Sequence, residues 1–210
     1  MQENLVELNE SYRLQHLFRA YRDPKSKIRR LVKSGELILL KRGLYALSDC
    51  ADQPRWICKI ANRLYGPSYV SFEYALRWWS LIPEHVAQIT SASFEKERQK
   101  RYDTPLGSFV YRDIPKSVYP MAVMLEGSEQ PRFLIASAEK ALCDQLYTIS
   151  GIRSFFELEA LLFDDLRVDY ERFQSLDKKL LTELANFYHT ETLNVCANYV
   201  RKLIREDVYG

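Results

Sequence analysis

The sequence predicts an α+β protein in two parts: a winged helix-turn-helix over residues 1–48 and a mixed α/β domain over residues 55–210 that ends in helices. Three observations support this. The first part has apolar residues at helical spacing, followed by a β-prone hairpin with a basic tip. The middle of the chain contains short β-prone runs, and its end contains apolar stripes at helical spacing. With 210 residues, of which 47% are hydrophobic and 28% charged, the chain can bury a sizeable core.

The first part is expected to hold three helices. Leu5 and Leu8 have helical spacing and predict one short helix. Leu14, Leu17, Phe18 and Tyr21 continue that spacing and predict a second helix that ends near residue 22.

The third helix has clear start and stop signals. Asp23 suits the N-cap because its carboxylate accepts hydrogen bonds from free amides, and Pro24 suits the first helical position. Gly35 is the usual residue at a C-terminal cap. We therefore expect this helix to run from Pro24 to about Ser34.

The third helix is amphipathic. Ile28, Leu31 and Val32 form one apolar stripe, so residues on the opposite face point outward. The predicted base-reading residues on that outer face are Ser26, Arg30 and Lys33. The predicted phosphate contacts that flank it are Lys25, Lys27 and Arg29.

A hairpin follows the third helix. Two β-prone runs, residues 36–40 and 44–47, are joined by Lys41, Arg42 and Gly43. Glycine permits the positive φ of a tight turn, and the two cations lie at the tip. Three helices and a basic-tipped hairpin describe a winged helix-turn-helix, whose third helix enters the major groove while Lys41 and Arg42 of the wing contact the DNA backbone.

Charge is unevenly distributed along the chain. The net charge is only +2, but residues 1–48 contain ten Lys or Arg against five Asp or Glu. Residues 49–149 contain twelve of each sign, and residues 150–210 contain eight basic against eleven acidic. This asymmetry favours double-stranded DNA as the partner of the first part. Two alternatives stay open: a solvated basic face, and a winged helix that docks protein.

The remaining chain predicts an α+β body with a helical end. Helices are expected from Arg55 to about Tyr65, after Ser71, and from Ser137 to Tyr147. Strands are expected over residues 88–94, 101–104, 107–114, 121–126 and 132–135. Beyond Phe155, leucine-rich stripes predict further helices.

No enzyme, metal site or cofactor is expected. The cysteines, Cys50, Cys58, Cys143 and Cys196, are far apart, and the three histidines lie near no second ligand. Possible nuclease carboxylates at Glu95, Glu97, Asp103 and Asp113 alternate with cations, which is typical of a solvated strand edge. Without a predicted secretion signal or membrane span, we expect a cytoplasmic protein.

Three segments of the chain read IRRLVKSGELILLKRGLYAL (28–47), YGPSYVSFEYAL (65–76) and IASAEKALCDQLY (135–147). In sequence and in order, they resemble segments of the AbiEi-type antitoxin family. The resemblance implies an antitoxin of a type IV toxin–antitoxin system. Such systems act in phage abortive infection. Such an antitoxin binds repeats in its own promoter, represses its operon, and counters a nucleotidyltransferase-like toxin without requiring a stable complex.

The third of these segments holds two further candidate residues. Lys140 and Asp144 are at i and i+4 on the predicted helix, where they can pair. They are candidates for contact with the partner toxin, and core packing is the alternative. For the whole chain, the alternative function is a stand-alone winged-helix repressor whose C-terminal domain docks a partner or senses a ligand.

Overall fold

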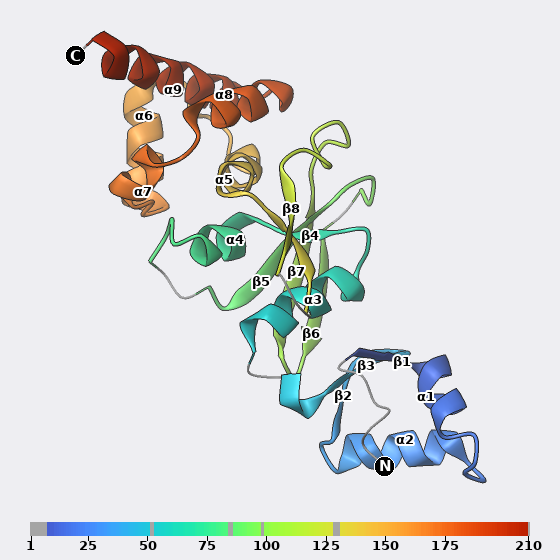
Figure 1. Cartoon of the computed structure of the whole chain (residues 1–210). Helices are drawn as coiled ribbons and strands as arrows, with labels where there is room; N and C mark the ends of the chain where they lie inside the picture. The colour runs from blue at the N-terminus through green and yellow to red at the C-terminus, as the bar shows by residue number, and fades with distance from the viewer. Residues whose placement is uncertain (1–7, 51–52, 84–85, 98, 128–130, 210) are drawn as a thin grey trace.

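Three blocks of structure follow one another along the chain (Figure 1). The computed structural model describes residues 8–50, 53–83, 86–97, 99–127 and 131–209. N-terminal helices pack with a three-stranded sheet, a six-stranded mixed sheet lies in the centre, and helices form the C-terminal end. The expected α+β class is confirmed. Within the described residues, no helix is long and apolar enough to cross a membrane.

Helix α2 (Pro24–Lys33) has the boundaries that its sequence signals predict. The Asp23 side chain accepts a hydrogen bond from the Ser26 amide, and Pro24 occupies the first turn. Ser34 is the C-cap, and Gly35 follows with φ of 80°, a conformation that glycine adopts without steric cost.

The expectation of a first helix through Leu8 is wrong. Leu8 belongs to strand β1 (Leu8–Glu10), which pairs antiparallel with strand β3 (Leu44–Leu47). Strand pairing with a distant segment therefore overrides the local helical spacing. The rest of that expected helix lies outside the described residues. The next helix, α1 (Ser11–Leu17), ends earlier than expected, because Phe18 leaves helical geometry as its C-cap.

The hairpin of β2 (Leu37–Lys41) and β3 has Gly43 in its turn with φ of 86°, as the sequence predicts. Together with β1 it forms a sheet of order β1-β3-β2. One side of this N-terminal module packs in a small core of Leu14, Phe18, Ile28, Leu31 and Leu37. Leu40, Leu44 and Ala46 instead join the large core of the body, so the small sheet is buried from both sides.

The central sheet has the order β6-β7-β5-β4-β9-β8 and mixes parallel with antiparallel pairs. Its strands are β4 (Tyr69–Val70), β5 (Gln88–Ser93), β6 (Lys100–Thr104), β7 (Gly107–Asp113), β8 (Val123–Glu126) and β9 (Phe133–Ala136). Five of the six lie where the sequence predicts strands. The two-residue strand β4 was not predicted.

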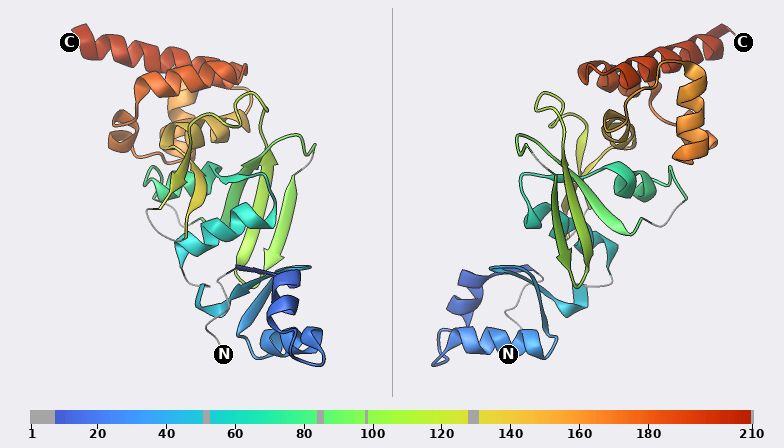
Figure 2. Two further views of the ribbon diagram at one scale, coloured as in Figure 1. Left: turned by 45° about the vertical axis from the view of Figure 1, so that its right-hand side comes forward. Right: turned by 180° about the vertical axis from the view of Figure 1, so that it is seen from behind.

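Helices cover both faces of this sheet (Figure 2). Successive residues of a strand point to opposite faces. Accordingly, Tyr111 donates a hydrogen bond to the Ala61 carbonyl in α3 (Pro54–Leu64), whereas Arg112 pairs with Glu73 in α4 (Phe72–Trp78) on the other side. Helix α5 (Ala138–Tyr147) packs against α4.

The C-terminal helices lie at the end of the molecule remote from the N-terminal module (Figure 1). They comprise α6 (Phe155–Glu159), a π-helical turn (Ala160–Asp165), α7 (Tyr170–Gln174), α8 (Lys178–Phe187) and α9 (Glu191–Tyr209). Helices α8 and α9 pack on each other and on α5, so the helical end shares the large core with the sheet.

Candidate nucleic-acid interface

One face of α2 is cationic and exposed. Ile28 and Leu31 are 4% and 5% exposed and fix the helix to the module, so the other side of the helix faces solvent. Four predicted site residues are exposed there and form what we call the α2 cationic face: Lys25, Arg29, Arg30 and Lys33. The structure thus brings four of the six predicted helix contacts together on one accessible surface.

The remaining two predicted residues of α2, Ser26 and Lys27, are half-buried. The Ser26 hydroxyl donates to the Asp23 carboxylate at 2.6 Å and accepts from the Arg29 guanidinium at 2.8 Å. The Lys27 ammonium lies 5.6 Å from the centre of the Tyr21 ring. Ser26 therefore acts in the N-cap of the helix, and Lys27 is held toward the preceding loop.

The capping network also tunes the charge of Asp23. The hydrogen bonds from Ser26, with a smaller contribution from Arg29, hold the pKa of the Asp23 carboxyl below its ordinary value. A carboxylate at a helix N-terminus is favourable because it meets free amides and the positive end of the helix dipole. Arg29, 3.8 Å from Asp23 and 75% exposed, can turn toward an outside anion with little loss.

Four other cations of the module have side chains without a described protein partner. Among the described residues, no hydrogen bond, carboxylate or ring contact engages the side chains of Lys25, Arg30, Lys33 or Arg42. Arg30 and Lys33 are one turn apart on α2 and point the same way. Exposed, unpaired cations on a rigid helix can neutralise phosphates and, for arginine, pair with a guanine edge.

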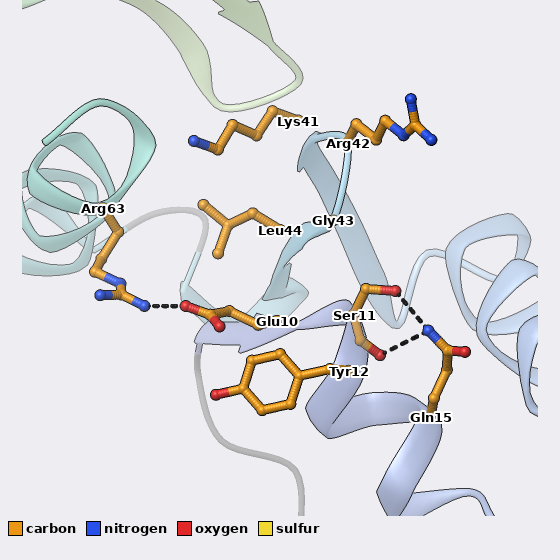
Figure 3. A pocket seen from close by; sticks show the side chains of 9 residues that line it. All are labelled: Glu10, Ser11, Tyr12, Gln15, Lys41, Arg42, Gly43, Leu44 and Arg63. Atoms are coloured by element: carbon orange, nitrogen blue, oxygen red, sulfur yellow. Dashed lines mark hydrogen bonds and ion pairs between the residues drawn. The ribbon is translucent and has the colours of Figure 1, made fainter.

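The two cations of the hairpin turn diverge (Figure 3). Arg42 is exposed and extends away from the body, whereas Lys41 extends toward α3. The Lys41 ammonium donates to the Leu64 carbonyl oxygen at 2.6 Å and lies 5.9 Å from the centre of the Tyr102 ring. Lys41 is thus engaged within the chain, and its predicted phosphate contact would require breaking this bond.

A cavity of about 550 Å³ lies where the module meets the body (Figure 3). Glu10 of the module and Arg63 of α3 form an ion pair across it. Tyr12, 71% exposed, lines the same cavity. No sequence pattern singles out Glu10, Tyr12 or Arg63, because their proximity depends on β1 pairing with the hairpin.

Lys140 and Asp144, the candidate partner residues, are fully buried. Their charged groups are 3.1 Å apart, and both side chains have 0% exposure. Asp144 also accepts hydrogen bonds from Ser71 at 2.6 Å and from Tyr69 at 3.0 Å, and Tyr188 bridges both charges. Neither side chain has surface with which to touch a partner, so this placement favours core packing, the alternative interpretation.

Burial explains the electrostatics of this Lys140–Asp144 network. It lowers the pKa of the Lys140 ammonium, an effect that the nearby Asp144 carboxylate opposes. Burial also raises the pKa of Tyr69 and Tyr188, and the Asp144 charge adds to that shift. The network joins β4, α5 and Tyr188, the C-cap of α8, and so it ties the sheet to the C-terminal helices.

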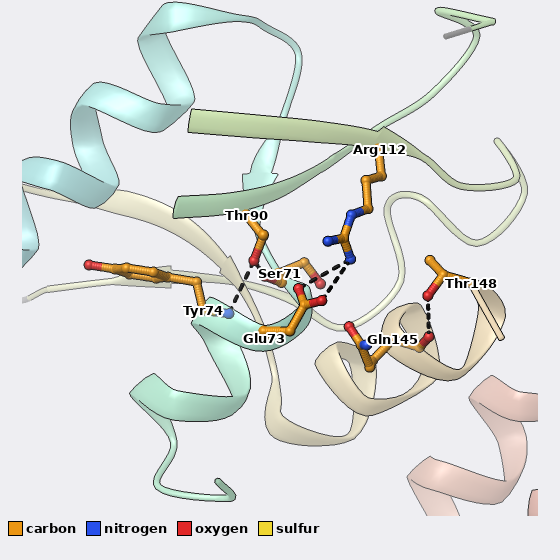
Figure 4. Close-up of polar contacts among 7 residues, drawn as sticks. All are labelled: Ser71, Glu73, Tyr74, Thr90, Arg112, Gln145 and Thr148. Atoms are coloured by element: carbon orange, nitrogen blue, oxygen red, sulfur yellow. Dashed lines mark hydrogen bonds and ion pairs between the residues drawn. The ribbon is translucent and has the colours of Figure 1, made fainter. Parts of the chain in front are cut away.

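A second polar cluster lies beside it, at the start of α4 (Figure 4). One guanidinium nitrogen of Arg112 donates to both carboxylate oxygens of Glu73, at 3.0 and 3.1 Å. The Thr90 hydroxyl donates to the Ser71 carbonyl at 2.7 Å and accepts from the Tyr74 amide. These bonds fix α4 to the sheet.

The carboxylates considered for a nuclease do not converge. Asp113 accepts from the Lys96 and Glu97 amides, Asp103 pairs with Arg101, and Glu95 pairs with Lys116. Across the described part of the chain, no three His, Cys, Asp or Glu side chains are grouped to hold a metal ion. The described thiols of Cys58, Cys143 and Cys196 are buried and unpaired.

No model of a protein family matches this chain, and no curated protein matches it either.

Proposed function

We propose that this chain is a DNA-binding transcriptional regulator whose N-terminal module is a winged helix-turn-helix. The observation that carries the proposal is the α2 cationic face, where Arg30 and Lys33 are exposed without a described protein partner. The opposite side of α2 is anchored on the small core, so the helix presents these cations on a rigid support. Recognition helices are supported in the same way when they enter the major groove.

The proposed interface divides into two kinds of contact. Arg30 and Lys33 lie centrally on the outer face of α2 and are assigned to base edges. Lys25, Arg29 and Arg42 lie around them and are assigned to phosphates. Lys41 is assigned to the internal contact with Leu64, and Ser26 to the helix cap.

We further propose, from the sequence resemblance, that the regulator is the antitoxin of a type IV toxin–antitoxin system. It would repress its own operon and counter a nucleotidyltransferase-like toxin. Co-expression tests this step: the chain should restore growth to cells that express such a toxin from the adjacent reading frame. Absence of such a reading frame, or failure to restore growth, would favour the stand-alone repressor.

DNA titration tests the first proposal. The protein is titrated against labelled duplex from immediately upstream of its own gene and against a scrambled duplex, at two salt concentrations. We expect the upstream duplex to bind at least about 10³-fold more tightly, with affinity falling steeply as salt rises. Equal and weak binding to both duplexes would contradict the proposal and favour a protein-docking module.

A further inference from the structure

Strand β8 is the outer strand of the central sheet, and part of its backbone faces outward. Its neighbour Leu134 in β9 directs both backbone groups away from β8, because the Asn62 side chain accepts from the Leu134 amide at 2.6 Å and donates to its carbonyl at 3.2 Å. Leu125 lies opposite Leu134. In an antiparallel ladder such a residue belongs to a non-hydrogen-bonded pair, so the N–H and C=O of Leu125 point away from the sheet.

The other end of β8 gives the same alternation. The Ser137 amide donates to the Ala122 carbonyl at 2.9 Å, which makes that pair hydrogen-bonded. Val123, the next residue, therefore also directs its backbone groups outward. Among the described residues, no group is bonded to the outward amides and carbonyls of Val123 and Leu125.

The side chains at this edge are apolar and exposed. Met124 is 43% exposed, Leu125 is 59% exposed, and Leu134 behind them is 41% exposed. Edge strands of soluble proteins usually carry lysine, proline or a bulge that blocks pairing. The opposite edge strand, β6, does carry charges, but β8 reads Val-Met-Leu-Glu, and its one charge, Glu126, is paired with Arg55.

We propose that β8 pairs antiparallel with β8 of a second copy of this chain, about a two-fold axis through Met124. The two outward-facing residues are two positions apart. This axis therefore sets Val123 opposite the partner's Leu125, and Leu125 opposite the partner's Val123. Both pairs then exchange their N–H···O bonds, and the two central sheets become continuous. The edge is self-complementary in its backbone, which is why the occupant is a second copy.

The side chains fit the same register. Met124 shares its face with Glu126, which pairs with Arg55 of α3, so the two Met124 side chains meet on the α3 side of the sheet. Leu125 packs against the partner's Val123 on the α4 side, with Leu134 behind it. Glu126 falls opposite the partner's Ala122, so the two Glu126 carboxylates do not face each other. Like charges directly opposite would oppose pairing, and this register avoids them.

The interface is small beside the roughly 800 Å² per partner of a standard complex, so the dimer is weak and depends on concentration. Its existence does not rest on DNA binding. If the proposed function holds as well, a two-fold dimer presents two α2 helices to an inverted repeat, and DNA strengthens the pairing through multivalency.

Sedimentation in the absence of DNA tests the dimer. The wild-type mass should rise from 24.7 kDa toward twice that value as concentration increases. Leu125→Lys should remain monomeric, because it places a lysine in each of the two Leu125–Val123 pairs between the subunits. Phe156→Lys, a matched change at a 78% exposed residue on α6, should dimerise as wild type does. A wild type that is monomeric throughout, or equal behaviour of the two variants, would overturn the proposal.

Cysteine cross-linking tests the register, in a Cys50→Ser background where the other native thiols are buried. Residues in a non-hydrogen-bonded pair have Cα atoms about 4.5 Å apart, within the range of a disulfide. Met124→Cys should therefore form a covalent dimer under mild oxidation. Leu134→Cys, one strand further from the axis, should not; a faster reaction at Leu134 would overturn the register. Because no DNA is present in these two experiments, a negative result would contradict the dimer and leave the proposed DNA binding untouched. Failure to bind DNA would likewise leave the proposed dimer untouched.

Discussion

The Lys41 ammonium donates a hydrogen bond of 2.6 Å to the Leu64 carbonyl oxygen, so the turn of the hairpin is fastened to the end of α3. Arg42, the next residue, extends away from the body and is exposed (Figure 3). Two adjacent cations of one turn therefore have different surroundings. The first holds the module to the body, and the second is available to an outside anion.

Replacing these two neighbours separates their roles. Arg42→Ala should weaken binding to all DNA sequences alike and reduce the salt slope of the affinity by about one, because one phosphate contact is lost. Lys41→Ala should leave that slope unchanged and lower the free energy of unfolding by about 1 kcal/mol, since the internal hydrogen bond is lost. Titrations at several salt concentrations and urea unfolding measure both. If Lys41→Ala flattens the slope as Arg42→Ala does, the hairpin turn contacts DNA with both residues.

Arg30 is predicted to read a base. Arg30→Ala should weaken binding to the specific duplex by about 1–3 kcal/mol and relax preference at one base position. Binding selection from a randomised duplex pool measures that preference. An equal loss of affinity on specific and scrambled DNA would make Arg30 a phosphate contact only.

The buried pair of Lys140 and Asp144 should matter to stability. Lys140→Met leaves Asp144 buried without its counter-charge, which should lower the free energy of unfolding by about 3–5 kcal/mol. Replacing both by apolar residues should recover much of the loss. Urea unfolding measures these differences.

The pair of Lys202 and Glu206 provides a matched control. It has the same i, i+4 spacing, but its side chains are 56% and 59% exposed. Lys202→Met should therefore change stability by no more than about 0.5 kcal/mol. Equal effects at the two pairs would contradict the assignment of Lys140 and Asp144 to the core.

The cap of α2 predicts a pH dependence. Because its pKa is lowered in the folded protein, the Asp23 carboxylate stabilises the fold above its unfolded-state pKa, near 3.8. That stabilisation is lost as pH falls through the lowered folded-state pKa. Wild type should therefore exceed Asp23→Asn in stability near pH 6, and the difference should vanish as pH falls well below 3.8. A difference that does not depend on pH would contradict a charged cap.

Much of the fold is predictable from local signals. Asp23, Pro24 and Gly35 bound α2 because caps depend on neighbouring residues, and Gly43 marks the hairpin turn for the same reason. Strand β1 escaped prediction because Leu8 follows helical spacing, while its pairing partner lies more than thirty residues away along the chain. Local patterns carry no information about that pairing.

Part of the candidate site is likewise predictable from local patterns, and part depends on tertiary packing. The exposed face of α2 follows from helical periodicity alone. The contact of Lys41 with Leu64 does not, because it depends on how module and body pack. The burial of Lys140 and Asp144 does not follow from the sequence for another reason: every residue of α5 from Lys140 to Leu146 is buried, so polarity does not mark an outer face of this helix.

The most direct measurement of the central claim is DNA binding by the double variant Arg30→Ala, Lys33→Ala. Its affinity for the upstream and scrambled duplexes is compared with that of wild type and of Lys179→Ala, an exposed lysine on α8 at the remote end. We predict that the double variant loses discrimination between the duplexes while Lys179→Ala binds as wild type does. If the double variant retains wild-type affinity and discrimination, the α2 cationic face is not the DNA-binding surface.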